Sequence, residues 1–147
     1  MNEFDSPHLD GLYKKYKIED TSLKPWIQWV RIALNDNPDV HIMGYYDSAT
    51  RTGHIESIEG SRQGHELMIL YLMEMYASKV NNISLDARTK DSDIITQDEL
   101  VNFYRRFGFM PKHVSLWWDW VNMEGVEWSS VIRQVQKYIE RKTMPQT

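Results

Sequence analysis

A short turn between two hydrophobic segments carries the residues with the clearest potential for chemistry. A strand is expected to end near Glu59 and a helix to begin around His65, and the residues between them are Gly60, Ser61, Arg62, Gln63 and Gly64. The first turn of a helix has backbone N–H groups without intrahelical partners and the positive end of the helix dipole, and both favour a phosphate or a carboxylate. The glycines allow a ligand to approach the backbone closely, and Arg62 can add a charged, bidentate hydrogen bond. The spacing therefore predicts an anion-binding turn.

A second motif, FYRRFGF, covers Phe103 to Phe109. Together with the turn it resembles the GCN5-related N-acetyltransferase (GNAT) family, which has a Q/R-x-x-G-x-G/A turn after its central strand and FYEKLGF-like residues further on. Aligned on Gly64, Ser61 stands at the Q/R position and Glu66 at the second small position. A carboxylate at that position would repel pyrophosphate unless it pointed away from the ligand. The compact arrangement of the two motifs is similar to that of small GNATs of the bacteriophage type.

The resemblance implies an α/β fold with a mixed, mostly antiparallel central sheet flanked by helices. The short sequence before residue 40 indicates a trimmed N-terminal half, and the apolar periodicity of residues 127–142 indicates an additional C-terminal helix. The resemblance also implies acetyl-CoA as acyl donor, with its thioester along the central strand and its pyrophosphate on the turn. The cofactor-binding residues implied in this way are Ser57, Ile58, Ser61, Arg62, Gln63, Gly64, His65, Glu66, Gln97 and Tyr104.

Transfer of an acetyl group to an amine needs a base for the protonated amine and an acid for the leaving thiolate. Glu56 and Glu59 are the nearest candidates for the base, and ordinary carboxylates at a strand edge are the alternative interpretation of both. Tyr104 matches the tyrosine of the family motif, which lies near the CoA sulfur and acts as general acid. A packing tyrosine is the alternative. The acceptor is an amine on a small molecule or a protein, and loops that vary freely determine which one.

Two other functions are compatible with the same residues. One is a GNAT-fold protein without transferase activity that acts by binding a protein partner through its tryptophan-rich C-terminal region, and Glu66 in the turn favours it. The other is binding of a phosphate-containing ligand without a reaction. The density of indoles around Leu116 to Trp120 also predicts a contact surface there, which would serve a homodimer.

Composition narrows the class of protein further. The 147 residues, 41% of them hydrophobic, are expected to form a single domain, with residues 1–11 as a flexible arm and residues 143–147 as a tail. A net charge of −4 with interspersed charges argues against nucleic-acid binding. The absence of cysteine excludes an acyl-cysteine intermediate, so direct attack in a ternary complex is expected. The histidines show no metal-ligand spacing, and no apolar run is long enough to cross a membrane, so we expect no metal, no membrane contact and a cytoplasmic protein.

The periodicity of apolar residues predicts the elements that hold these groups. A first strand or short helix is expected over residues 12–18, and a helix beginning at Thr21 or Ser22 over residues 21–34, with Pro25 in its first turn. A hairpin is predicted for residues 40–46 and 54–58, followed by a broadly apolar helix from residue 67 and a strand over residues 83–87. Thr96 and Glu99 form a capping box that begins the next helix, and Gly108 ends it. An aromatic-rich strand is predicted for residues 113–120.

Overall fold

The computed structural model describes residues 7–60, 63–88, 96–116 and 120–143. Its strands are β1 (Tyr16–Lys24), β2 (Ile27–Leu34), β3 (Asn37–Asp47), β4 (Thr52–Glu59), β5 (Asn82–Ala87), β6 (Met110–Val114) and β7 (Val121–Glu124). Its helices are α1 (Pro7–Lys15), α2 (Gly64–Ala77), α3 (Gln97–Arg105) and α4 (Trp128–Thr143).

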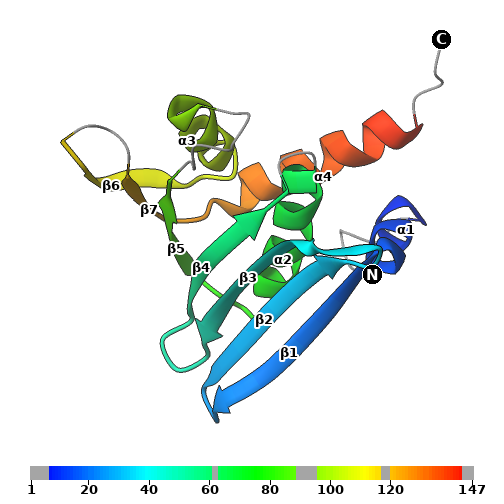
Figure 1. Cartoon of the computed structure of the whole chain (residues 1–147), viewed down its shortest axis with the longest axis horizontal. Helices are drawn as coiled ribbons and strands as arrows, with labels where there is room; N and C mark the ends of the chain where they lie inside the picture. Colours follow the sequence, from blue (N-terminus) through cyan, green and yellow to red (C-terminus); the bar gives the residue numbers. More distant parts are fainter. Residues whose placement is uncertain (1–6, 61–62, 89–95, 117–119, 144–147) are drawn as a thin grey trace.

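The strands form one seven-stranded sheet in the order β1-β2-β3-β4-β5-β7-β6 (Figure 1). The paired strands are antiparallel except for β4 and β5, which are parallel and are connected through α2. The predicted fold class, a mixed and mostly antiparallel sheet flanked by helices with an additional C-terminal helix, is confirmed. No helix within the described residues is long and apolar enough to cross a bilayer.

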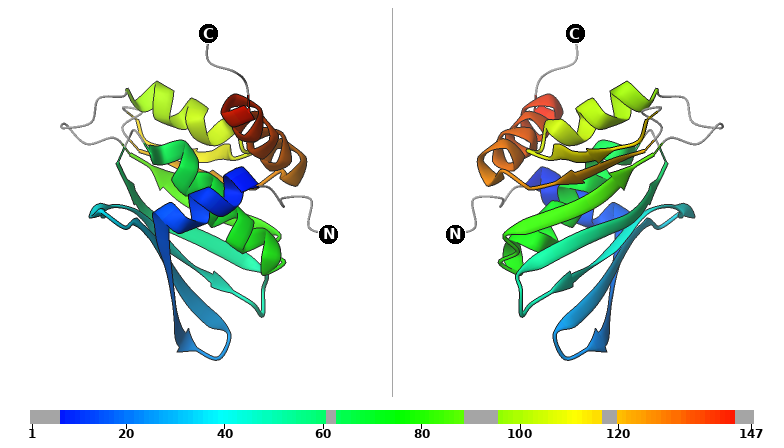
Figure 2. Two further views of the ribbon diagram at one scale, coloured as in Figure 1. Left: turned by 90° about the vertical axis from the view of Figure 1, so that its right-hand side faces the viewer. Right: turned by 90° about the vertical axis from the view of Figure 1, so that its left-hand side faces the viewer.

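Helix α2 forms the centre of the core. Its residues 67–73 and Met75 are buried, and it contacts strands β2, β3 and β4 as well as α4. Figure 2 shows α1, α2 and α4 on the same side of the long strands β1 to β4. Burying one Leu or Met side chain stabilises the folded state by about 1.5–3 kcal/mol. The buried residues of α2 therefore fix the positions of β4, which precedes the helix in the chain, and β5, which follows it. The prediction of a helix covered on more than one side is confirmed.

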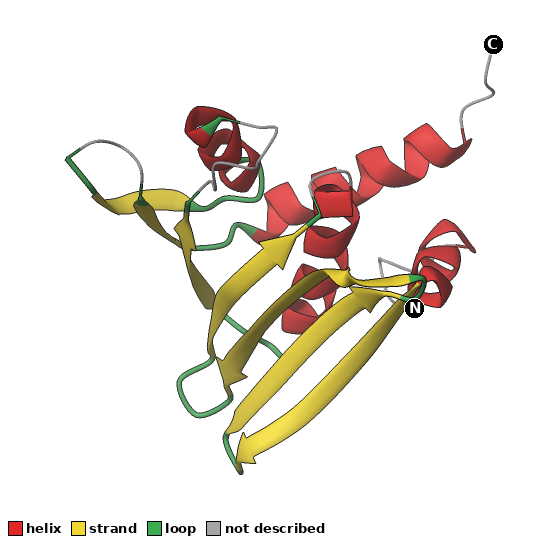
Figure 3. Cartoon of the chain, viewed as in Figure 1, coloured by secondary structure: helices red, strands yellow, loops and turns green. Residues whose placement is uncertain are grey.

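The helix predicted for residues 21–34 is wrong. The segment contains the end of β1 and all of β2, joined by a turn at Pro25 and Trp26 (Figure 3). In β2, Val30 and Ile32 are buried while Arg31 between them is partly exposed, which is the period of two that a strand requires. The apolar spacing of this segment fits a helix as well as a strand, and pairing of β2 with β1 and β3 decided between them. Pro25 serves the turn, where its fixed φ is favoured, rather than a first helical turn.

Two further predictions need correction. Residues 7–11, expected to belong to a flexible arm, are part of α1, which begins at Pro7; proline suits the first helical position because its missing N–H is not needed there. The single strand predicted for residues 113–120 is wrong, since β6 ends at Val114 and a separate strand, β7, begins at Val121. The two strands pair as an antiparallel hairpin. Trp117 and Trp118 lie outside the described residues.

The elements with strong local signals are confirmed. Thr96 Oγ1 accepts a hydrogen bond from Glu99 N, and the Glu99 carboxylate accepts one from Thr96 N, both at 3.1 Å, so the capping box begins α3 as predicted. Gly108 follows this helix with φ of +92°, and a Cβ there would collide with the backbone of Glu127. The hairpin of β3 and β4 and the alternating burial of β5 also agree with the prediction.

Candidate functional site

Strands β4 and β5 separate halfway along their length. Residues 52–55 of β4 pair with residues 82–85 of β5, whereas β4 continues to Glu59 and β5 to Ala87 without pairing to each other. A cavity of about 760 Å³ lies at this divergence, and its walls include residues 56–60, Leu85, Asp86 and Arg88. The unpaired strand edges that face it can form hydrogen bonds with an extended ligand, as an added strand would.

A β-bulge in β4 produces part of this divergence. Met43 pairs with Ser57 and Gly44 pairs with Ile55, so Glu56 is the additional residue. A bulge bends its strand and redirects the side chain next to it. Gly44 permits the arrangement because a Cβ there would collide with the carbonyl of His54 and lie 2.7 Å from the hydroxyl of Tyr71. The Tyr71 hydroxyl itself donates a hydrogen bond to the carbonyl of His54 at 3.1 Å, which ties α2 to the strand at the bulge.

The predicted anion-binding turn lies at one end of the cavity. Gly60 has φ of +103°, and Gln63 N donates a hydrogen bond to the carbonyl of Gly60 at 3.0 Å. Gly60, Gly64 and His65 line the cavity, whereas Gln63 does not, and its side chain makes no capping hydrogen bond to α2. Ser61 and Arg62 lie outside the described residues. The first two residues of α2, Gly64 and His65, therefore line the cavity together with Gly60, which precedes the helix.

Glu66, the departure from the family pattern, points away from the cavity. Its carboxylate accepts hydrogen bonds from Lys15 Nζ at 3.0 Å, Tyr16 Oη at 2.8 Å and Tyr138 Oη at 3.1 Å. Burial alone would raise the pKa of the Glu66 carboxyl, but the hydrogen bonds from Tyr16, Lys15 and Tyr138 outweigh it and lower the pKa. The carboxylate thus joins α1, β1 and α4 to the first turn of α2. Its pairing with Lys15 outside the cavity reduces the repulsion of a bound anion that the sequence predicted.

Arginines from distant segments contribute positive charge to the cavity wall. Arg106 follows α3, Arg141 lies near the end of α4, and both line the cavity with His65. Burial lowers the pKa of His65, and the charges of Arg141 and Arg106 lower it further. A hydrogen-bonding contact with Gln134 raises it, but the pKa is lowered overall. The sequence alone did not identify Arg106, Arg141 and Arg88 as residues of the site. For Arg106 a signal existed, because it lies in the FYRRFGF motif beside Tyr104; for Arg141 only the fold reveals the position.

No protein-family profile matches the sequence, and no characterised protein matches it by sequence. Solved structures do match the fold. An acetyltransferase from Streptococcus agalactiae 2603 is 12% identical with a TM-score of 0.50, covering 78% of this chain and 100% of that one. A second protein assigned as an acetyltransferase is 10% identical with a TM-score of 0.53, covering 90% of this chain and 72% of that one. The chain has a GNAT-like fold.

A protein from Desulfovibrio desulfuricans assigned to the GNAT family is 14% identical and covers 68% of this chain and 69% of that one, but its TM-score of 0.47 is too low to carry an argument. At these identities the likeness establishes the fold alone. Nothing in the comparisons supports the narrower bacteriophage-type subgroup.

The GNAT-like fold brings the three predicted catalytic residues to one cavity. Glu56, Glu59 and Tyr104 all line it, together with Ser57 and Ile58. Tyr104 is only 3% exposed, and its ring packs edge-on against Phe103 and Phe109. Burial raises the pKa of Tyr104, so the phenol is protonated at neutral pH and holds its proton more tightly than an exposed tyrosine does. Gln97 is not brought to the cavity; its amide donates to the carbonyl of Ala87 at 2.8 Å and holds the end of β5.

Proposed function

We propose that this protein is an N-acetyltransferase that moves an acetyl group from acetyl-CoA to an amine by direct attack in a ternary complex. The observation that carries the proposal is the cavity between the diverging ends of β4 and β5, because it combines unpaired strand edges with the first turn of α2. The strand edges suit the amide groups of a pantetheine arm, and the helix turn suits a pyrophosphate. A volume of about 760 Å³ lies within the usual range for ligand cavities.

The charges in the cavity wall support an anionic donor and a cationic acceptor. Arg106 and Arg141 stand near His65 at the start of α2, where they would face the phosphates of acetyl-CoA. Glu56, Glu59 and Asp86 belong to the part where β4 and β5 diverge, and carboxylates there would attract a protonated amine. The phosphates of the cofactor and the ammonium group of the acceptor would then face side chains of opposite charge, with Arg88 also in the wall beside the carboxylates. The amine is carried by a small molecule or a protein.

The nitrogen of the ammonium group loses two protons in the reaction, and the leaving thiolate gains one. In our proposal Glu56 or Glu59 takes a proton from the ammonium group, directly or through water, and the free amine attacks the thioester carbonyl. The new C–N bond forms, the C–S bond breaks, and Tyr104 gives its proton to the leaving thiolate. The second proton of the attacking nitrogen returns to the Tyr104 phenolate, directly or through water, and the proton held by the carboxylate passes to solvent. The products are an amide and free CoA. His54 Nε2 lies 3.8 Å from Glu56 Oε1, so an imidazole stands beside one of the two candidate bases.

The first test is whether acetyl-CoA binds, and binding is measured by thermal denaturation and by calorimetry. At 100 times its dissociation constant, a ligand specific for the folded state adds about 2.7 kcal/mol of stability, so the melting temperature should rise clearly. Release of free thiol with a panel of primary amines then reports transfer. An unchanged melting temperature at millimolar acetyl-CoA would refute the proposal, and binding without thiol release for any amine would leave a binding protein as the better description.

The chain offers matched controls for the charged cofactor contacts. Arg106→Gln and Arg141→Gln should each weaken acetyl-CoA binding by about tenfold or more, because a charge-assisted hydrogen bond contributes about 1.5–3 kcal/mol. Arg105→Gln, next to Arg106 in the same motif, and Arg133→Gln, on the same helix as Arg141, remove equal charges outside the cavity wall. These controls should bind normally. Equal losses in all four variants would mean that general surface charge, not the cavity, attracts the cofactor.

A further inference from the structure

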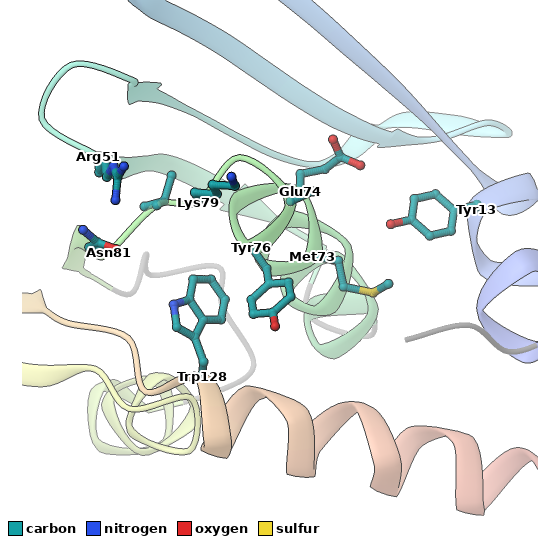
Figure 4. Close-up of a pocket in the computed structure, with 10 residues that line it drawn as sticks. Tyr13, Arg51, Met73, Glu74, Tyr76, Lys79, Asn81 and Trp128 are labelled. Carbon is teal, nitrogen blue, oxygen red and sulfur yellow. The ribbon is translucent and has the colours of Figure 1, made fainter. Parts of the chain in front are cut away.

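A second cavity lies at the opposite end of α2. It has a volume of about 490 Å³ and is lined by Tyr13, Arg51, Met73, Glu74, Tyr76, Ala77, Lys79, Val80, Asn81 and Trp128. None of these residues lines the cavity between β4 and β5. Figure 4 shows Arg51 and Asn81 at one end and Glu74 and Tyr13 at the other, with Tyr76 and Trp128 along the wall between them. The proposed transferase function makes no use of this cavity.

Two basic residues with unusual backbone conformations supply its positive end. Arg51 has φ of +57° and Lys79 φ of +60°, and within the described residues they are the non-glycine residues with positive φ. Asn81 N donates a hydrogen bond to the carbonyl of Arg51 at 2.7 Å, which holds the β3–β4 loop beside the end of α2. Glycine and asparagine are favoured at such positions, so Lys and Arg side chains there reduce stability. Neither side chain has a hydrogen bond or an ion pair to another described residue.

A half-buried carboxylate supplies the negative end. Glu74 lies on α2, and burial, followed by the charge of Asp20, raises the pKa of its carboxyl. Burial and the charge of Glu74 raise the pKa of Tyr13 nearby to about 12. Among the described residues, Glu74 has no ion pair or hydrogen bond through its side chain. A charged group that loses water without gaining a protein partner is in a suitable state to receive a cationic group of a ligand.

An aromatic wall connects the two charged ends. The rings of Tyr76 and Trp128 meet edge to face with centroids 5.2 Å apart, and Tyr76 remains 37% exposed. Glu74 lies in the last turn of α2, Lys79 follows the end of the helix, and Figure 4 shows Arg51 and Glu74 on opposite sides of the cavity. An aromatic ring with a carboxylate and an ammonium group in para relation carries its two charges at opposite ends. Its faces can pack against the aromatic wall.

The geometry points to a second small-molecule site, for an aromatic zwitterion whose carboxylate binds Arg51 and Lys79, whose ring packs on Tyr76 and Trp128, and whose ammonium group binds Glu74. This site is independent of the acyl-transfer cavity. It explains why basic side chains occupy positions where the backbone favours glycine, since the ligand needs their charges.

The experiment titrates three related probes by calorimetry and NMR. The probe 4-(aminomethyl)benzoate has both charges, 4-methylbenzoate only the carboxylate, and 4-methylbenzylamine only the ammonium group. We expect the doubly charged probe to bind at least tenfold more tightly than either singly charged probe. No binding of the doubly charged probe at millimolar concentration, or equal affinities for all three probes, would overturn the proposal.

Variants assign the contacts without endangering the fold. Glycine fits the backbone conformations at residues 51 and 79, so Arg51→Gly and Lys79→Gly should each raise the melting temperature by about 2 °C. Each should also weaken binding of the doubly charged probe at least fivefold. Glu74→Gln should abolish the advantage of the doubly charged probe over 4-methylbenzoate. Lys112→Gln, an exposed cation on β6, should change nothing. Unchanged probe affinity in both glycine variants would refute the site. Acetyl-CoA binding, measured in parallel, should be equal in all variants and separates this test from that of the transferase.

Discussion

The two ends of α2 bind ligands, in our proposals, by opposite means. At the N-terminal end, Gly60 and Gly64 line the cavity without side chains, and the charges come from Arg106 and Arg141 on other elements. At the C-terminal end, Arg51 and Lys79 keep long charged side chains in left-handed backbone conformations that favour glycine. The two proposals together predict that a position favouring glycine can serve ligand binding with or without a side chain. The backbone would contact the ligand in the first case, and the side chain would in the second.

Loss of the Tyr104 hydroxyl should have the largest effect, confined to the N-terminal end. Tyr104→Phe keeps the ring packed against Phe103 and Phe109 and removes only the acid. Turnover should fall by about 10² to 10⁴, the usual contribution of a positioned acid, with acetyl-CoA affinity close to normal. Steady-state kinetics and calorimetry measure both. Undiminished turnover in a well-folded variant would make Tyr104 a packing residue.

Glu66→Ala should separate the structure of this end from its chemistry. The change removes the acceptor of the Lys15, Tyr16 and Tyr138 hydrogen bonds, and the free energy of unfolding should fall by about 1–3 kcal/mol. Because the carboxylate points away from the cavity, acetyl-CoA affinity of the folded variant should not increase. Denaturant unfolding and calorimetry provide the measurements. Tighter acetyl-CoA binding would show that Glu66 acts on the ligand after all.

The same carboxylate predicts a dependence on acidity. The pKa of Glu66 is lower in the folded protein than its ordinary value of 4.5. Its stabilising contribution is therefore complete above pH 4.5 and is lost as the pH falls below that value through the folded pKa. Unfolding measured from pH 6 down to about pH 3 should show a smaller loss of stability in Glu66→Gln than in the wild type. Parallel curves would place the acid sensitivity elsewhere.

A pair of opposite substitutions tests the comparison of the two ends directly. Gly60→Ala introduces a Cβ at φ of +103° and 2.8 Å from Val40, so it should destabilise the protein by about 1–2 kcal/mol. Lys79→Gly relieves the left-handed conformation and should stabilise it by up to about 1 kcal/mol. Both are measured by denaturant unfolding. Changes of the same sign would contradict the view that the two turns make opposite use of glycine.

The smallest expected effect concerns the tip of the β6–β7 hairpin. Leu116 is 88% exposed, and we propose that self-association, where it occurs, uses this region. Leu116→Glu should change the free energy of unfolding by less than about 0.5 kcal/mol, as surface substitutions do, while weakening any dimer seen by sedimentation at high concentration. Dimerisation that persists unchanged in this variant would place the contact elsewhere.

The sequence predicted those parts of the fold whose signals are local. Thr96 and Glu99 cap α3 through their own neighbours, and Gly108 ends its final turn, so residue types alone were sufficient. The prediction for the segment that forms β2 was wrong because its apolar spacing fits a helix as well as a strand, and pairing with β1 and β3 decided between them. The residues of the candidate site fall into the same two groups, those with a local signal in the sequence and those that only the fold brings to the site. The turn and Tyr104 were recognisable, whereas Arg141 and the direction of Glu66 depend on where α4 and α1 pack.

The short ladder between residues 52–55 of β4 and residues 82–85 of β5 joins two units of the sheet. Strands β1 to β4 form one unit, and β5, β7 and β6 form the other. A ligand that forms hydrogen bonds with both free edges would replace the missing ladder and couple the units mechanically. Amide hydrogens along residues 56–59 and 86–87 should then exchange more slowly in the complex, and the two halves of the sheet should open together instead of separately. Cofactor binding would in this sense complete the fold.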